Sequence, residues 1–167
     1  GGNDSIAGWT GNETIDGGDG ADTLNGGLGN DSIVGGTGID RLVFTGTGPV
    51  FVDMGAGGST GIGAGSLQGQ DTFTGIEHVV GTSGADTLIG GNGDDGLDGG
   101  DGNDRIDGGS GADAIDAGSG ADTVVGGDDN DTIIATGGLT GDVLSGGNGA
   151  DSILSSQGAD SIDGGDG

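Results

Sequence analysis

The chain has 167 residues, of which 49 are glycine. It has 28 acidic residues and only two arginines, which gives a formal net charge of −26 at pH 7. This charge repels nucleic acid and anionic membrane surfaces, so we expect no nucleic-acid binding, no membrane insertion, and cations as partners. Cysteine is absent, which excludes disulfides and thiolate metal sites. The composition alone is typical of disordered chains, and only the order of the residues argues against disorder.

The order of the residues shows a nine-residue period. Residues 99–107 read GGDGNDRID and residues 108–116 read GGSGADAID, so the general form is G-G-x-G-x-D-x-U-x, with U a large aliphatic residue. A short fixed period predicts one structural unit stacked many times around a continuous buried row. In chain order the aliphatic position is occupied by Ile6, Ile15, Leu24, Ile33, Leu42, Val79, Leu88, Leu97, Ile106, Ile115, Val124, Ile133, Leu144, Ile153 and Ile162.

The period divides the chain into three parts. Residues 1–43 form a first repeat block, and residues 81–167 form a second block with a two-residue insertion near 135–140, which we expect to bulge outward as a loop. Residues 44–80 connect the blocks, and we interpret them as degenerate, wider turns of the same solenoid. The chain begins and ends within a repeat, so we expect it to be part of a longer array.

The connector has its own composition: it contains the only proline, methionine and histidine of the chain and all three phenylalanines. Residues 50–54 and 73–80 predict strands, and residues 55–69 predict a Gly/Ser loop between them. We expect the phenylalanines to fill the wider turns and His78 to be a surface or gap-filling residue. A separate inserted subdomain is the alternative, but the connector is too short to build a core of its own.

Each repeat combines a turn, G-G-x-G-x-D, with a short strand, x-U-x. Glycine permits positive φ and close approach of the backbone, so several carbonyl oxygens can point to one centre. Side chains alternate along a strand, so only U points inward. Two strands and two turns close one coil of eighteen residues, and residue i then lies over residue i+18. This spacing predicts about nine coils, about 4.8 Å apart.

The acidic position runs two residues ahead of the aliphatic one. Thirteen of these fourteen positions are Asp and one is Glu13. Stacking brings carboxylates eighteen residues apart together, such as Asp86 and Asp104, while the insertion is expected to disturb the pairing of Asp122 with Asp142. The candidate metal ligands are Asp4, Asp22, Asp31, Asp40, Asp86, Asp95, Asp104, Asp113, Asp122, Asp131, Asp142, Asp151 and Asp160.

An all-oxygen ligand set with flexible glycine geometry predicts Ca²⁺, which takes six to eight oxygens. Mg²⁺ demands stricter geometry, and Zn²⁺ prefers nitrogen and sulfur ligands. Carboxylate pairs eighteen residues apart give three candidate sites in the first block and up to seven in the second, and ten Ca²⁺ ions would bring +20 against −26. One aliphatic residue per repeat buries too little surface to offset the backbone entropy, so the metal-free chain is predicted to be unfolded or loose.

Four repeats carry a resemblance to a known family: GGDGADTLN (17–25), GGLGNDSIV (26–34), GGNGDDGLD (90–98) and GGNGADSIL (146–154). They resemble the RTX (repeats-in-toxin) nonapeptide of secreted bacterial proteins. The resemblance implies an all-β fold, a right-handed parallel β-roll with 18-residue coils and Ca²⁺ between stacked turns. It also implies folding outside the cell or at the bacterial surface, and export by type I secretion. The Asp at the sixth place of each repeat would then supply side-chain ligands, and loop carbonyls the others.

These observations predict a calcium-binding module rather than an enzyme, with no catalytic residues in this chain. Two alternatives stay open. The array could be a structural repeat of a surface-layer, adhesin or filament protein, which would associate through further repeats or copies. It could also be the secretion module of an enzyme or toxin whose catalytic domain lies outside this sequence.

Overall fold

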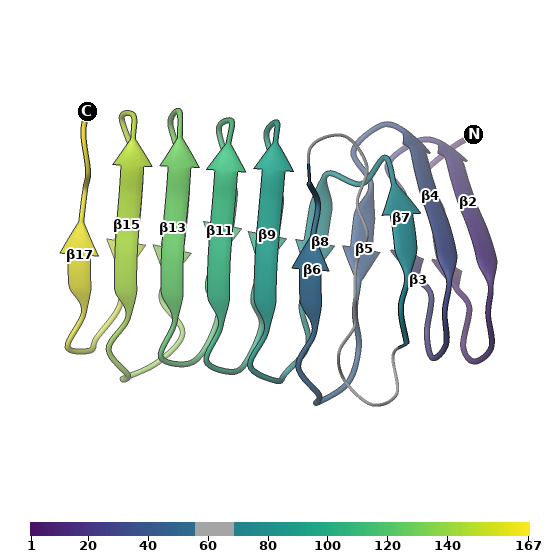
Figure 1. Ribbon diagram of the computed structural model, residues 1–167, viewed down its shortest axis with the longest axis horizontal. Helices are drawn as coiled ribbons and strands as arrows, with labels where there is room; N and C mark the ends of the chain where they lie inside the picture. The colour runs from purple at the N-terminus through teal and green to yellow at the C-terminus, as the bar shows by residue number, and fades with distance from the viewer. Residues whose placement is uncertain (56–68) are drawn as a thin grey trace.

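A computed structural model describes residues 1–55 and 69–167 of the chain. The described residues form a parallel β-solenoid without helices, so none of their elements is a helix that could cross a membrane. The strands stack along the long axis of the molecule, and the two termini lie at opposite ends (Figure 1). The all-β, parallel fold that the nine-residue period predicts is therefore confirmed.

The strands lie on two faces of the solenoid. The first face is one sheet of eight strands, in the order β1 (Ser5–Ala7), β3 (Thr23–Asn25), β5 (Arg41–Val43), β8 (His78–Val80), β10 (Gly96–Asp98), β12 (Ala114–Asp116), β14 (Thr132–Ala135) and β16 (Ser152–Ser155). The second face has a three-stranded sheet of β2 (Thr14–Asp19), β4 (Ser32–Thr37) and β7 (Thr72–Thr74), and a six-stranded sheet of β6 (Phe51–Asp53), β9 (Thr87–Asn92), β11 (Arg105–Ser110), β13 (Thr123–Asp128), β15 (Val143–Asn148) and β17 (Ser161–Asp163).

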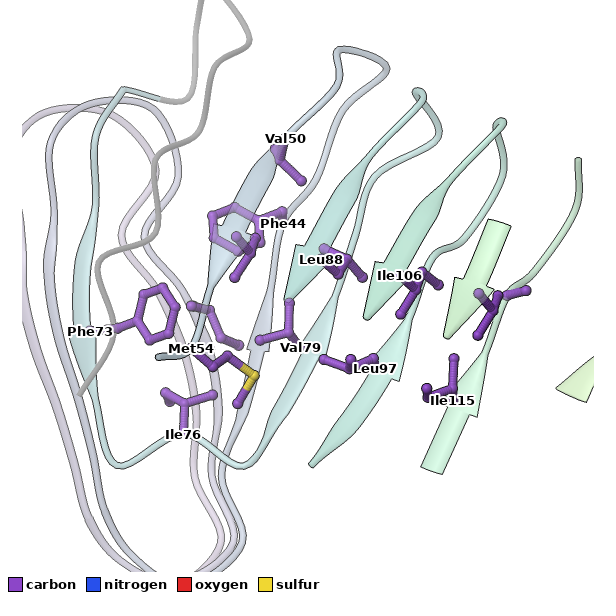
Figure 2. Packing of buried hydrophobic residues seen from close by; sticks show 14 of the residues in the cluster. Phe44, Val50, Met54, Phe73, Ile76, Val79, Leu88, Leu97, Ile106 and Ile115 are labelled. Carbon is purple, nitrogen blue, oxygen red and sulfur yellow. The ribbon is translucent and has the colours of Figure 1, made fainter. Parts of the chain in front are cut away.

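The register follows the eighteen-residue coil. Ile6 pairs with Leu24 on the first face, and Leu88 pairs with Ile106 on the second. Because side chains alternate along each strand, the aliphatic residues of both faces meet in one buried row between them. Figure 2 shows part of this row, with Leu97 and Ile115 beside Leu88 and Ile106. At the C-terminal end Ile162 is 51% exposed, because β17 has a neighbouring strand on one side only.

The connector departs from the regular coil. Along the first face, Leu42 of β5 pairs with Val79 of β8, an offset of 37 residues, so the intervening chain fills one coil rather than two. Its additional length includes an extra strand, β6, which pairs with β9, whereas β7 pairs with β4. In Figure 1, β6 lies between β7 and β9 although it precedes β7 in sequence. The first face therefore has eight strands, one fewer than the predicted nine coils.

The three phenylalanines of the connector differ in their burial. Phe44 and Phe73 are buried, but Phe51 is 36% exposed because it alternates with the buried Val52 on β6. The expectation that the phenylalanines fill the wider turns therefore agrees with the burial of Phe44 and Phe73, whereas Phe51 lies partly exposed on β6. The predicted strand 73–80 is interrupted at Gly75, whose φ is 63°, and is divided between β7 and β8. Most of the predicted Gly/Ser loop lies outside the described residues.

The two-residue insertion is accommodated in the turn before β15. Ser119 still bridges Gly137 at an offset of 18, whereas the backbone N–H of Asp122 donates to Asp142 Oδ1 at an offset of 20 (2.9 Å). The extra residues therefore lie between these two contacts, where Leu139 is 79% exposed. The expectation that the insertion disturbs the pairing of Asp122 with Asp142 is wrong, because the additional length bulges outward before the strand begins.

Candidate calcium-binding turns

The acidic residues form two ladders, one along each turn edge of the solenoid. The backbone N–H of one acidic residue donates to a carboxylate oxygen of the next coil, as from Asp4 to Asp22 Oδ1 (2.8 Å) and from Asp104 to Asp122 Oδ1 (2.9 Å). The same contact recurs from Asp95 to Asp113 and from Asp131 to Asp151, at 2.9 Å each. Each ladder contact uses one oxygen of the accepting carboxylate.

The second carboxylate oxygen is the distinctive feature of these turns. In ten acidic residues it is buried and has no hydrogen-bond partner among the described residues. These atoms are Glu13 Oε2 and the Oδ2 atoms of Asp22, Asp31, Asp40, Asp95, Asp104, Asp113, Asp122, Asp131 and Asp151. A buried carboxylate oxygen without a donor is costly, and the usual remedies are a proton or a cation.

The first glycine of each repeat leaves space for these oxygens. A Cβ placed on Gly17 would lie 2.5 Å from Asp22 Oδ2 and 2.6 Å from the carbonyl oxygen of Gly35. On Gly99 it would lie 2.6 Å from both Asp104 Oδ2 and the carbonyl oxygen of Ala117. The unpartnered carboxylate oxygen and a carbonyl oxygen of the next coil therefore converge on a space that any side chain at the glycine would fill.

Burial changes the acidity of these groups. It raises the pKa of Asp95 and Asp113 to about 6 and that of Asp104 to about 7. Neighbouring carboxylates raise the pKa further, as Glu77 and Asp94 do at Asp95, while the N–H of Asp86 acts in the opposite direction at Asp104. The ladders therefore hold negative charge at a cost that a nearby cation would relieve.

The donor set fits a hard cation. The converging atoms are carboxylate and carbonyl oxygens, which suit Ca²⁺ better than metals that prefer nitrogen or sulfur. Among the described residues, no three His, Asp or Glu side chains converge on one point, so carbonyls would have to complete any coordination shell. Turns with three glycines in six residues can supply those carbonyls.

The thirteen predicted ligands differ in whether they carry an unpartnered buried oxygen. Nine of them carry an unpartnered buried oxygen, and Asp4, Asp86, Asp142 and Asp160 do not. At Asp86 the reason is visible, because the hydroxyl and N–H of Thr82 donate to its carboxylate. Glu13, which departs from the repeat pattern, nevertheless carries an unpartnered oxygen like the aspartates.

Two ladder members were missed by the sequence reasoning. Asp71 Oδ1 accepts the N–H of Asp31 (2.9 Å), and Glu77 Oε2 accepts the N–H of Asp40 (2.8 Å), so both continue the ladders into the connector. Each lies two residues before a buried strand residue, Phe73 or Val79. This spacing is the signal that could have identified them.

A second, outer ladder lies one residue before the acidic one. Asn3 Oδ1 accepts the N–H of Ala21 (3.0 Å), and Asn103 Oδ1 accepts the N–H of Ala121 (3.0 Å). Asp94 Oδ1 accepts an N–H of the next coil in the same way. These hydrogen bonds connect consecutive turns at the fifth repeat position and thereby help to align the acidic residues beside them.

Stacked turns with buried, unpartnered carboxylate oxygens and converging carbonyls define an acidic, cation-binding repeat solenoid. The model of the RTX calcium-binding nonapeptide repeat (4 copies) matches residues 1–24, 10–42, 71–106, 98–133 and 136–167, which together are most of the chain. The chain belongs to this RTX repeat family.

No curated protein matches the sequence. Among solved structures, the extracellular lipase LipA from Serratia marcescens is similar, with a TM-score of 0.42 and 22% sequence identity over 93% of this chain. The match covers 31% of the lipase chain.

Proposed function

We propose that the chain is a calcium-binding module of a larger secreted protein, and that its repeat blocks fold when Ca²⁺ binds. The observation that carries the proposal is the set of ten buried carboxylate oxygens without partners. In the metal-free chain these oxygens favour unfolding, and a bound cation reverses the balance because it binds the folded turns only.

The proposed ligands are twelve of the thirteen predicted aspartates with their neighbouring carbonyls, and Glu13 joins them because its Oε2 is unpartnered as well. Asp86 is left out, because N–H groups of Thr82 and Val50 already donate to its two carboxylate oxygens. The coiled blocks 1–43 and 81–167 hold the ions, and residues 44–80 connect them. We propose that about ten ions bind, which would offset most of the formal charge of −26. Catalysis, nucleic-acid binding and membrane insertion are no part of this proposed function.

The calcium concentration inside and outside the cell determines where the chain would fold. Sensor-class sites saturate at micromolar Ca²⁺, whereas extracellular modules work at about 10⁻⁴–10⁻³ M. We propose that the chain stays unfolded at cytosolic calcium, leaves a bacterial cell by type I secretion and folds outside at millimolar calcium. The family assignment supports this setting, because the RTX nonapeptide is typical of secreted bacterial proteins.

Far-UV circular dichroism of the chain in calcium and in chelator tests the proposal. We expect β-structure in calcium and its loss from most of the chain in chelator, with Mg²⁺ at equal concentration a poor substitute. Isothermal titration calorimetry then counts the ions. Equal β content with and without calcium would contradict the proposed function.

A further inference from the structure

The unpartnered carboxylate oxygens are distributed unevenly along the solenoid. None of them lies between Asp40 and Asp95 in the part of the chain that the structure describes. We call strands β5 to β9, residues 41–55 and 69–92, the central unit, and residues 1–40 and 95–167 the arms. All ten unpartnered oxygens lie in the arms, so the two regions stabilise their acidic turns differently.

Within the central unit, Asp86 shows the difference most clearly. Its Oδ2 accepts the N–H of Thr82 (2.5 Å) and the Thr82 hydroxyl (3.1 Å), while its Oδ1 accepts the N–H of Val50 (2.7 Å). Thr82 is buried, and its hydroxyl also lies 2.9 Å from the carbonyl oxygen of Gly48, so its single proton is shared between this carbonyl and the carboxylate. Both oxygens of this carboxylate therefore have donors from the protein itself.

The backbone explains why Thr82 can take this role. It occupies the second repeat position, where glycines elsewhere adopt positive φ, such as Gly18 at 94° and Gly100 at 91°. Thr82 does not have a positive φ, so its turn follows a different path that brings the hydroxyl to the carboxylate. A glycine at this position could supply no hydroxyl at all.

The central unit also has the densest apolar core of the chain. Besides the regular aliphatic Val79, it buries Phe44, Val50, Val52, Met54, Phe73 and Ile76, whereas the arms bury little more than one aliphatic side chain per nine residues. Figure 2 labels all of these side chains except Val52 in the region around Val79. Each large buried side chain contributes roughly 1.5–3 kcal/mol, so this region gains most from burial alone.

The pairing of its strands makes the unit largely self-contained. β5 pairs with β8 and β6 pairs with β9, so four of its five strands have a partner inside the unit. β7 pairs outward, with β4 of the first arm. A folded central unit therefore offers strand edges on which both arms can begin to stack.

We propose that the central unit is a calcium-independent folded element, in which Thr82 does at Asp86 what a cation does in the arms, and that the arms assemble on it when calcium binds. The proposal rests on the proposed function, since it assumes that the arms need calcium. In this proposal the irregular part of the solenoid folds without calcium and offers the strand edges on which the repeats stack.

Peptide-resolved hydrogen exchange of the full chain in calcium and in chelator tests the proposal. In chelator we expect peptides of the central unit to exchange at least about tenfold more slowly than peptides of the arms, and in calcium all to be protected. If all regions gain protection together on adding calcium, the proposed function holds and the calcium-independent unit is overturned. If the arms are equally protected without calcium, both are overturned.

A substitution localises the effect to the hydroxyl. Thr82→Val keeps the size of the side chain and removes its hydroxyl, while the N–H groups of Thr82 and Val50 still donate to Asp86. We therefore expect the central unit to lose part of its protection in chelator and to regain it in calcium. Thr74→Ala, on the exposed side of β7, is the matched control and should leave both exchange patterns unchanged. An unchanged central pattern in Thr82→Val would overturn the role given to Thr82.

Discussion

The arms and the central unit bury carboxylates at the same place in each coil, directly before a strand, but they satisfy them by different means. At Asp104 in an arm, Oδ2 has no partner, whereas at Asp86 in the central unit both oxygens accept hydrogen bonds from the protein. The arms thus keep the donor-poor turn that a cation can complete. The central unit replaces the cation with a hydroxyl and N–H groups.

The comparison also concerns apolar content. An arm repeat uses three glycines and one aliphatic residue, so its turns are shaped for oxygen ligands and its core is thin. The central unit interrupts the repeat and places Phe44 and Phe73 in the interior instead. A regular repeat therefore has low stability without metal, because the glycines that shape its turn for a cation leave few apolar side chains to bury.

The largest expected effect comes from truncating the core of each region. Phe73→Ala should cost about 3–5 kcal/mol and Ile115→Ala about 2–5 kcal/mol in calcium, measured by urea unfolding. In chelator only Phe73→Ala should have an effect, since the arm around Ile115 is already unfolded. Phe73→Leu is the conservative control. An effect of Ile115→Ala in chelator would show that the arm folds without metal.

A smaller effect separates the two kinds of acidic turn. Asp104→Asn alters a turn with an unpartnered oxygen and should reduce the calorimetric stoichiometry by about one Ca²⁺ ion. Asp86→Asn should leave the ion count unchanged, while it weakens the central unit because one amide donor now faces the donors of Thr82. Equal losses of calcium in the two variants would remove the distinction between the regions.

The acidity of the buried groups gives a pH dependence. The pKa of Asp104 rises from 3.8 to about 7, and those of Asp95, Asp113 and, in the central unit, Asp71 rise to about 6, chiefly through burial. The folded state then binds more protons than the unfolded state between about pH 4 and 7, so metal-free stability falls as pH rises through this window. Because protons compete with the cation, calcium affinity should rise over the same window.

Circular dichroism in chelator checks this prediction. We expect more β-structure at pH 4.5 than at pH 7.5, with the change located in the arms. Calorimetry near pH 6 in two buffers of different ionisation enthalpy should show protons released as calcium binds. Metal-free β content that increases with pH would contradict the sign of these pKa shifts.

The regular coils could be predicted from the sequence, since a strict period of nine sets the strand register and the acidic ladder together. The connector could not be predicted in the same detail. Asp31 donates to Asp71 across 40 residues and Asp40 to Glu77 across 37, offsets that no period indicates. The reversed spatial order of β6 and β7 depends on tertiary pairing.

The satisfied carboxylate of Asp86 was equally hidden from the sequence. Thr82 stands at the second repeat position, where most repeats have glycine, and the sequence pattern predicts Asp86 as a metal ligand like the other aspartates. Only the local backbone shows that its hydroxyl and N–H reach the carboxylate. Departures from a repeat therefore need a physical interpretation one by one, and we expect Trp9, with a φ of 79°, to be one that costs stability.

The smallest expected effect comes from the two non-glycine residues with positive φ, Trp9 and Asp129, both at 79°. Each replaces a repeat glycine, and Trp9 is 80% exposed, so it loses little packing on removal. Trp9→Gly should stabilise the calcium-loaded chain by about 1 kcal/mol, since the left-handed region costs a residue with a Cβ about that much. Asp129→Gly should act likewise, whereas Ala21→Gly, where φ is not positive, should destabilise the chain.

Because Trp9 and Asp129 lie in the arms, neither change should alter hydrogen exchange of the central unit in chelator. Urea unfolding of the three variants in calcium measures the differences, and a destabilised Trp9→Gly would show that the indole has a contact worth more than the strain.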